Sequence, residues 1–128
     1  MRLLVDTHLL LWAATRPELL SSDARSYLGD PANDLLYSVA SLWEVAIKTS
    51  LGRESFRVDA GLLRRGLLAN GYAELAISGL HAAAVAQLPA IHKDPFDRLL
   101  VAQATVENLT LLTSDAVVAR YPGSIRNV

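Results

Sequence analysis

Four acidic side chains stand where a metal site could form, at the junctions between predicted strands and predicted helices. Asp6 and Asp115 each follow a short apolar run, while Glu44 and Asp97 each lie in the first turn of a predicted helix. Ligands of open parallel sheets bind beyond the carboxyl ends of the strands, so we expect Asp6 and Asp115 at one edge of the sheet. Glu44 and Asp97 could reach the same edge. The sequence therefore predicts a cluster of four carboxylates.

Such a cluster needs something to compensate its negative charge. Two carboxylates about 5 Å apart repel each other by roughly 3 kcal/mol at an effective dielectric constant of 20. Lysine or arginine could compensate them, but a divalent cation does so with the oxygen ligands already present. The chain contains no cysteine, which leaves hard oxygen atoms as the metal ligands. The expected cofactor is therefore Mg²⁺ or Mn²⁺.

The aspartates also have a purely structural interpretation. Asp6 and Asp115 could be ordinary helix N-caps. Asp94 stands at the N-cap of a strong helix start, with a proline after it and Asp97 three positions later.

Glu44 has two structural interpretations. It could close a capping box with Ser41, three residues before it, or form an ion pair with Lys48, four residues after it. If the four acidic side chains lie apart in the fold, these structural interpretations are sufficient; if they lie together, a metal site is favoured.

Short apolar runs alternate with segments of helical periodicity along the chain. Strands are predicted at residues 3–5, 35–39, 74–77 and 110–113, with a last one near 125. Helices are predicted at residues 7–14, from 21 or 22 to 28, and at 41–52, 59–70, 80–88 and 95–107, with a short one near 116. Parallel strands need crossover connections that cover both faces of a sheet. We therefore expect a three-layer α/β sandwich with a mostly parallel central sheet.

Length and composition favour one small globular domain. The chain has 128 residues, of which 52% are hydrophobic, so we expect a single domain over residues 1–128. Thirteen acidic and twelve basic residues give a net charge of −1, so any contact with nucleic acid must come from local patches. The apolar run at residues 9–14 is far shorter than the roughly 20 residues that span a bilayer. We expect a soluble protein of the cytoplasm, whose reducing conditions suit a chain without cysteine.

Four segments form a pattern whose order and spacing are specific. They are LVDTH at residues 4–8, SVASLWE at 38–44, HKDPFDRLLVAQA at 92–104 and LTSD at 112–115. Together they resemble the PIN-domain family, and specifically its VapC-like toxin branch, over nearly the whole chain. The resemblance implies a PIN-like fold, which is a Rossmann-like sandwich.

Residue by residue, the resemblance implies that Asp6 and Asp97 are the principal metal ligands, while Glu44 and Asp115 complete the catalytic acidic pocket. The run LLVAQA that follows looks like the family helix led by Asp97. Asp94 is therefore assigned chiefly to capping, with a secondary electrostatic role left open.

The activity that the resemblance implies is metal-dependent hydrolysis of phosphodiester bonds in single-stranded RNA. The metal would lower the pKa of a bound water and offset the charge of the transition state, and a second ion could join with the substrate. The expected products carry 5′-phosphate and 3′-hydroxyl ends. VapC-like proteins pair as homodimers and are silenced by a cognate VapB-like antitoxin, so both partners are expected for this chain.

Two polar residues beside the acids are candidate substrate contacts. Thr7 could bind a phosphate or a ligand carboxylate at a helix N-terminus, or it could be a plain capping hydroxyl. Arg98 could contact a phosphate or orient a carboxylate, or it could form a surface ion pair. A looser basic stretch could follow the RNA backbone, although a solvated helix face explains it as well; it contains Lys48, Arg53, Arg57, Arg64 and Arg65.

The histidines and tryptophans are expected to be structural. His8, His81 and His92 lack the close spacing of a histidine metal site, so we expect packing or surface roles for them. Trp12 and Trp43 stand among apolar residues at helical intervals, which favours packing in the core or at a dimer interface over base stacking.

Two other functions use similar features. A signalling receiver domain also has an acidic pocket on an α/β sheet, but it requires a second acid beside Asp6 and a lysine after a late strand, and the chain has neither. A non-catalytic PIN-like module that binds RNA or protein is the other alternative. The complete set of acids argues against it.

Overall fold

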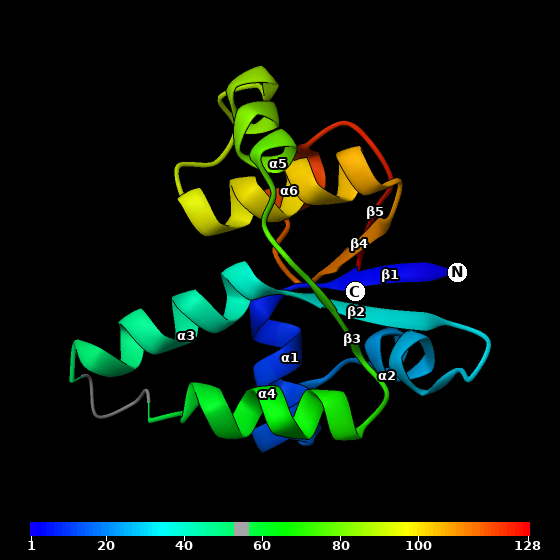
Figure 1. Cartoon of the computed structure of the whole chain (residues 1–128). Helices are drawn as coiled ribbons and strands as arrows, with labels where there is room; N and C mark the ends of the chain where they lie inside the picture. Colours follow the sequence, from blue (N-terminus) through cyan, green and yellow to red (C-terminus); the bar gives the residue numbers. More distant parts are fainter. Residues whose placement is uncertain (53–56) are drawn as a thin grey trace.

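The computed structural model describes residues 1–52 and 57–128, in which a parallel sheet of five strands lies between two layers of helices (Figure 1). The strands are β1 (Arg2–Val5), β2 (Asp34–Ser38), β3 (Ala73–Leu75), β4 (Thr110–Thr113) and β5 (Ile125–Asn127). Neighbouring strands are parallel throughout the order β3-β2-β1-β4-β5. The predicted three-layer α/β sandwich is confirmed.

The strand order creates a switch point between β1 and β4. From β1 the chain adds β2 and β3 on one side of the sheet, and later adds β4 and β5 on the other side. Leu4 of β1 is in register with Leu36 of β2 and with Leu111 of β4. At such a point the connections leave the sheet in opposite directions, which opens a crevice at the carboxyl ends of the two strands.

The α-helices of the described residues cover both faces of the sheet. They are α1 (Thr7–Thr15), α2 (Ser22–Gly29), α3 (Val39–Ser50), α4 (Ala60–Ala69), α5 (Gly79–Ala84) and α6 (Pro95–Glu107). In Figure 1, α1, α2 and α4 lie on one side of the sheet, and α5 and α6 lie on the other. None of these helices combines the length and the apolar character that crossing a membrane requires.

The central strand β1 is buried on both faces, which explains its continuous apolar run. Leu3 and Val5 pack with Leu10 of α1 in one core, while Leu4 packs with Leu100 of α6 in the other. Side chains of successive strand residues point to opposite faces, so a strand between two helical layers needs apolar residues at every position.

Helix α3 begins earlier than the sequence predicts. The hydroxyl of Ser38 accepts a hydrogen bond from the N–H of Ala40 at 3.0 Å, which makes Ser38 the N-cap. The predicted capping box of Ser41 and Glu44 is therefore wrong, because both residues lie inside the helix and both are buried. The helix predicted at residues 80–88 is also shorter. It ends at Ala84 and continues as a 3₁₀ turn, since a proline at position 89 disfavours helical geometry before it.

Candidate active site

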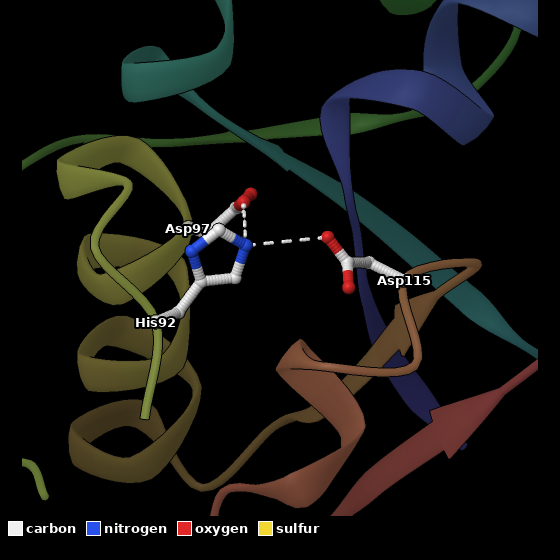
Figure 2. A group of neighbouring side chains, drawn as sticks. All are labelled: His92, Asp97 and Asp115. Atoms are coloured by element: carbon white, nitrogen blue, oxygen red, sulfur yellow. Dashed lines mark hydrogen bonds and ion pairs between the residues drawn. The ribbon is translucent and has the colours of Figure 1, made fainter. Parts of the chain in front are cut away.

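The carboxyl ends of β1 and β4 bring Asp6 and Asp115 to the switch point of the sheet. Asp6 directly follows β1 and is the N-cap of α1, and Asp115 follows β4. Asp97 enters from the first turn of α6 and Glu44 from the second turn of α3. Figure 2 shows the carboxylates of Asp97 and Asp115 turned toward the imidazole of His92.

Asp6 is buried and hydrogen-bonded through both carboxylate oxygens. Its Oδ1 accepts the N–H of Leu9 at 3.0 Å, and its Oδ2 accepts the hydroxyl of Thr113 at 2.5 Å. Burial raises the pKa of Asp6 above its ordinary value, although these hydrogen bonds oppose the shift. Asp6 is therefore a helix cap and, at the same time, a carboxylate held rigidly at the edge of the sheet.

Asp97 lies among like charges. Burial raises the pKa of Asp97 to about 7, helped by repulsion from Asp94, Glu44 and Asp6 and opposed by His92. The mutual repulsion shows that acids from three separate segments of the chain share one pocket. A carboxyl with such a pKa is half protonated at neutral pH, and a nearby cation would ionise it.

Asp94 has both of the roles that the sequence suggests. Its Oδ1 accepts the N–H groups of Phe96 at 2.8 Å and of Asp97 at 3.1 Å, so it caps α6. Its charge also contributes to the raised pKa of Asp97. Asp94 therefore fixes the first turn of α6, which carries Asp97 into the pocket.

Glu44 is 3% exposed and has one satisfied and one unsatisfied oxygen. Its Oε2 lies 2.6 Å from Nζ of Lys48, which confirms the predicted ion pair across one helical turn. Its Oε1 is buried and has no hydrogen-bond partner among the described residues. An unpaired buried carboxylate oxygen is costly, so its presence beside Asp97 marks a place where a cation fits.

Asp115 is tied to Asp6 through one hydroxyl group. The side chain of Thr113 accepts the N–H of Asp115 at 3.0 Å and donates to Asp6. Desolvation would raise the pKa of Asp115, but hydrogen bonds from the N–H groups of Val117 and Val118 and from His92 outweigh it and hold the pKa below its usual value. Asp115 is thus an ionised carboxylate at neutral pH.

His92 is a member of the site that the sequence analysis missed. Its Nε2 lies 3.3 Å from an oxygen of Asp97 and 3.3 Å from an oxygen of Asp115. The expectation of a packing or surface role did not include this position between two acids, to which the loop before α6 brings the imidazole. The signal available in the sequence was its position two residues before the N-cap Asp94.

The donor set fits a hard divalent cation. Ligand atoms of His92, Asp97 and Asp115 lie within 4.8 Å of one another. Asp6 and Glu44 are outside this group, but their charges raise the pKa of Asp97, so they contribute negative charge to the same region. His92 itself is a poor ligand in this conformation. Its Nδ1 accepts the N–H of Asp94 at 3.1 Å, so the proton of the neutral ring is on Nε2. The carboxylates would hold the ion, and His92 would orient two of them.

The two candidate substrate contacts have partners within the chain. The Thr7 hydroxyl is buried and donates to the hydroxyl of Ser41 at 2.9 Å, which connects α1 to α3. The guanidinium of Arg98 donates to two backbone carbonyls, at residues 85 and 89, and to the hydroxyl of Tyr121. Their contacts with a substrate stay predictions.

The basic stretch is partly engaged in ion pairs. Lys48 pairs with Glu44, and Nε of Arg64 lies 2.7 Å from a carboxylate oxygen of Glu74. Arg53 lies outside the described residues. These pairs connect the stretch to the fold itself, so they give no separate support for a path along an RNA backbone.

Comparisons with known proteins concern the family and the fold of the chain. The sequence profile of the PIN domain matches residues 3–124. No curated protein sequence is similar enough to count as a match. Similar solved structures include VapBC2 from Rickettsia felis bound to a DNA fragment from their promoter, at 17% identity and a TM-score of 0.73 over 99% of this chain and 98% of that one. A toxin-antitoxin complex from Klebsiella pneumoniae matches at 19% identity and a TM-score of 0.64 over 97% of this chain and 95% of that one. VapBC-1 from nontypeable Haemophilus influenzae matches at 17% identity and a TM-score of 0.62 over 99% and 98% of the two chains. At these identities the likeness concerns the fold, and the family rests on the profile that spans nearly the whole sequence: the chain belongs to the PIN domain family.

Proposed function

We propose that this protein is a metal-dependent endoribonuclease that hydrolyses phosphodiester bonds of single-stranded RNA, with Asp6 and Asp97 as the principal ligands of a Mg²⁺ or Mn²⁺ ion. The observation that carries the proposal is the convergence of Asp97, Asp115 and His92, whose ligand atoms lie within 4.8 Å of one another. Burial and repulsion from neighbouring acids, which raise the pKa of Asp97 to about 7, support it. A pocket that keeps a carboxyl half protonated at neutral pH is electrostatically unsatisfied until a cation enters. The unpaired oxygen of Glu44 points to the same need.

The side chains of the site are already oriented for this chemistry. A bound divalent ion would supply a water of lowered pKa and positive charge opposite the phosphate. The hydroxyl of Thr113 fixes Asp6, and the N–H groups of Val117 and Val118 fix Asp115. His92 holds Asp97 and Asp115 at equal distances from its Nε2. Carboxylates fixed in this way bind a cation without a further loss of side-chain freedom.

We also infer the cellular role of this activity. The similar structure from Klebsiella pneumoniae is a toxin-antitoxin complex and the one from Rickettsia felis is VapBC2, which supports a toxin role for this chain with a VapB-like antitoxin as its partner. A homodimer in the cytoplasm is part of the same proposal. Growth arrest on expression of the chain, relieved by Asp97→Asn, is the expected behaviour of such a toxin.

Cleavage of a labelled single-stranded RNA by the full chain tests the enzyme activity. We expect cutting in Mn²⁺, none in EDTA, and a loss of roughly 100-fold or more with Asp97→Asn or Asp6→Ala. Asp97→Asn is the more informative variant, because Asp6→Ala also removes the N-cap of α1. Asp23→Asn, which changes an exposed carboxylate on α2, is the matched control and should cut normally. Cutting that persists in EDTA or in both site variants would overturn the mechanism.

A further inference from the structure

Two aromatic rings, one exposed and one half-buried, belong to residues next in sequence to two acids of the site, and they have no part in the chemistry proposed above. Trp43 of α3 and Phe96 of α6 meet edge to face, with ring centroids 5.4 Å apart and planes inclined by 78°. Trp43 is 57% exposed, which excludes the expected packing in the core, while the expected packing at a dimer interface stays a prediction. The open ring surface of the pair is mainly that of Trp43, because Phe96 is half-buried.

The pair is carried by the same helical turns as two of the acids. Trp43 directly precedes Glu44, and Phe96 directly precedes Asp97. Consecutive Cα atoms are 3.8 Å apart, so the backbone that positions the rings also positions the carboxylates. The rings therefore stand one residue away from two acids of the site along α3 and α6.

We propose that Trp43 and Phe96 form a stacking platform for a nucleobase of the RNA strand, next to the phosphate held at the acidic site. This inference rests on the proposed ribonuclease function. Proteins that bind single-stranded nucleic acid stack bases on aromatic side chains and hold the backbone with cations. Lys93, an exposed cation three residues before Phe96, supplies such a charge in the loop that enters the site.

A second copy of the chain is the alternative occupant of this surface. A symmetric contact through the pair would bring two acidic pockets together, and their like charges would oppose it. A nucleotide brings instead a phosphate whose binding needs the cation of the site. The position of the rings beside the acids therefore favours the nucleobase.

The test follows the fluorescence of Trp43 in a Trp12→Phe background, where it is the single tryptophan of the chain. A single-stranded RNA oligonucleotide titrated in the presence of Ca²⁺ should quench this fluorescence. Trp43→Leu keeps an apolar side chain but removes the aromatic face, and we expect it to raise both the Kd, measured by anisotropy of labelled RNA, and the KM for cleavage about fivefold or more. The kcat should change less than about twofold, and Trp43→Phe should lose less than Trp43→Leu.

An oligonucleotide series with one abasic position at a time locates the stacked base. With the abasic site at one particular position, wild type and Trp43→Leu should bind the oligonucleotide with equal Kd, because the base that would stack on Trp43 is missing. Unchanged Kd and KM in Trp43→Leu would overturn the platform while leaving the ribonuclease function intact. A change of sedimentation mass in Trp43→Leu would also overturn it and assign the rings to a second copy. A wild-type protein that neither cuts nor binds RNA would overturn both proposals.

Discussion

Nε2 of His92 lies 3.3 Å from Oδ2 of Asp97, and the same nitrogen lies 3.3 Å from Oδ2 of Asp115. Asp97 belongs to α6 and Asp115 follows β4, so the imidazole connects a helix to the edge of the sheet. The ring is itself fixed, because its Nδ1 accepts the N–H of Asp94 and its backbone N–H donates to the Tyr121 hydroxyl at 2.8 Å. The imidazole of His92 therefore sets the separation between the carboxylates of Asp97 and Asp115.

Replacing His92 should therefore weaken metal binding without removing a ligand. We expect His92→Ala to lower the apparent Mn²⁺ affinity or the cleavage rate by about 10- to 100-fold, as for other residues that orient metal ligands. His92→Gln retains an N–H donor and should lose less. The measurement is a Mn²⁺ titration of RNA cleavage by the three proteins. Equal activity in wild type and His92→Ala would show that the acids keep their positions without the imidazole.

The stability of the metal-free protein should fall as the pH rises from about 4 to 7. The pKa of Asp97 is about 7 in the folded protein against 3.8 for an ordinary aspartate, so the folded state binds this proton more tightly. Its stabilising contribution is complete below pH 4 and is lost as the pH rises through 7. The effect amounts to a few kcal/mol, and Asp6, whose pKa is also raised, adds to it.

Thermal unfolding in EDTA across this pH range measures the effect. Asp97→Asn should be more stable than wild type at pH 8 and similar to it at pH 4, and added Mg²⁺ should raise the Tm of wild type more at pH 8 than at pH 5. Asp23→Asn controls for the loss of an exposed carboxylate. A wild-type profile parallel to that of Asp97→Asn would contradict the raised pKa.

The sequence patterns that predicted the fold correctly were those with strong local signals. Helix α6 and strand β4 have the predicted bounds, since Asp94 and a following proline begin the helix, and two leucines between two threonines form the strand. The meeting of Asp6 and Asp115 followed from the rule for parallel sheets. Membership of the PIN domain family, found over residues 3–124, also removes the receiver-domain alternative.

The features that the sequence did not predict depend on tertiary contacts. Ser38 caps α3 in place of Ser41 because β2 ends one residue earlier than expected, and both serines fit a cap by type alone. His92 joins the site only through the path of its loop, which no periodicity describes. The exposure of Trp43 depends on whether another element covers that face of α3, and a helical apolar pattern cannot show this.

The ion pair of Lys48 and Glu44 should stabilise the site through the buried carboxylate. Lys48→Met removes the Nζ that lies 2.6 Å from Glu44, and we expect a loss of about 1–3 kcal/mol of unfolding free energy, because a buried charge loses its partner. Adding Glu44→Gln to Lys48→Met should recover most of that loss. Urea denaturation of both single variants and the double variant measures the coupling. Strictly additive effects would show that the two side chains act independently.

Arg98 offers a test between a structural role and a substrate contact. Its guanidinium donates to the carbonyls of residues 85 and 89 and to the hydroxyl of Tyr121, so it connects α6 to two loops. Lysine cannot reproduce this fork of hydrogen bonds although it keeps the charge. We therefore expect Arg98→Lys to lower the unfolding free energy by about 1–3 kcal/mol, with a KM for RNA within about twofold of wild type.

The comparison variant is Tyr121→Phe, which keeps the aromatic ring and removes the hydroxyl shared by Arg98 and the backbone N–H of His92. It leaves both carbonyl contacts of Arg98 in place, so it separates the hydroxyl contact from the other two. A phosphate contact would give the opposite result. A guanidinium that breaks its hydrogen bonds to the two carbonyls in order to bind RNA contributes more to the affinity for RNA than to the free energy of unfolding. A rise in KM of about tenfold with unchanged stability in Arg98→Lys would assign Arg98 to the substrate. Urea denaturation and steady-state cleavage of the same protein preparations separate the two roles, since only one of the two quantities should change.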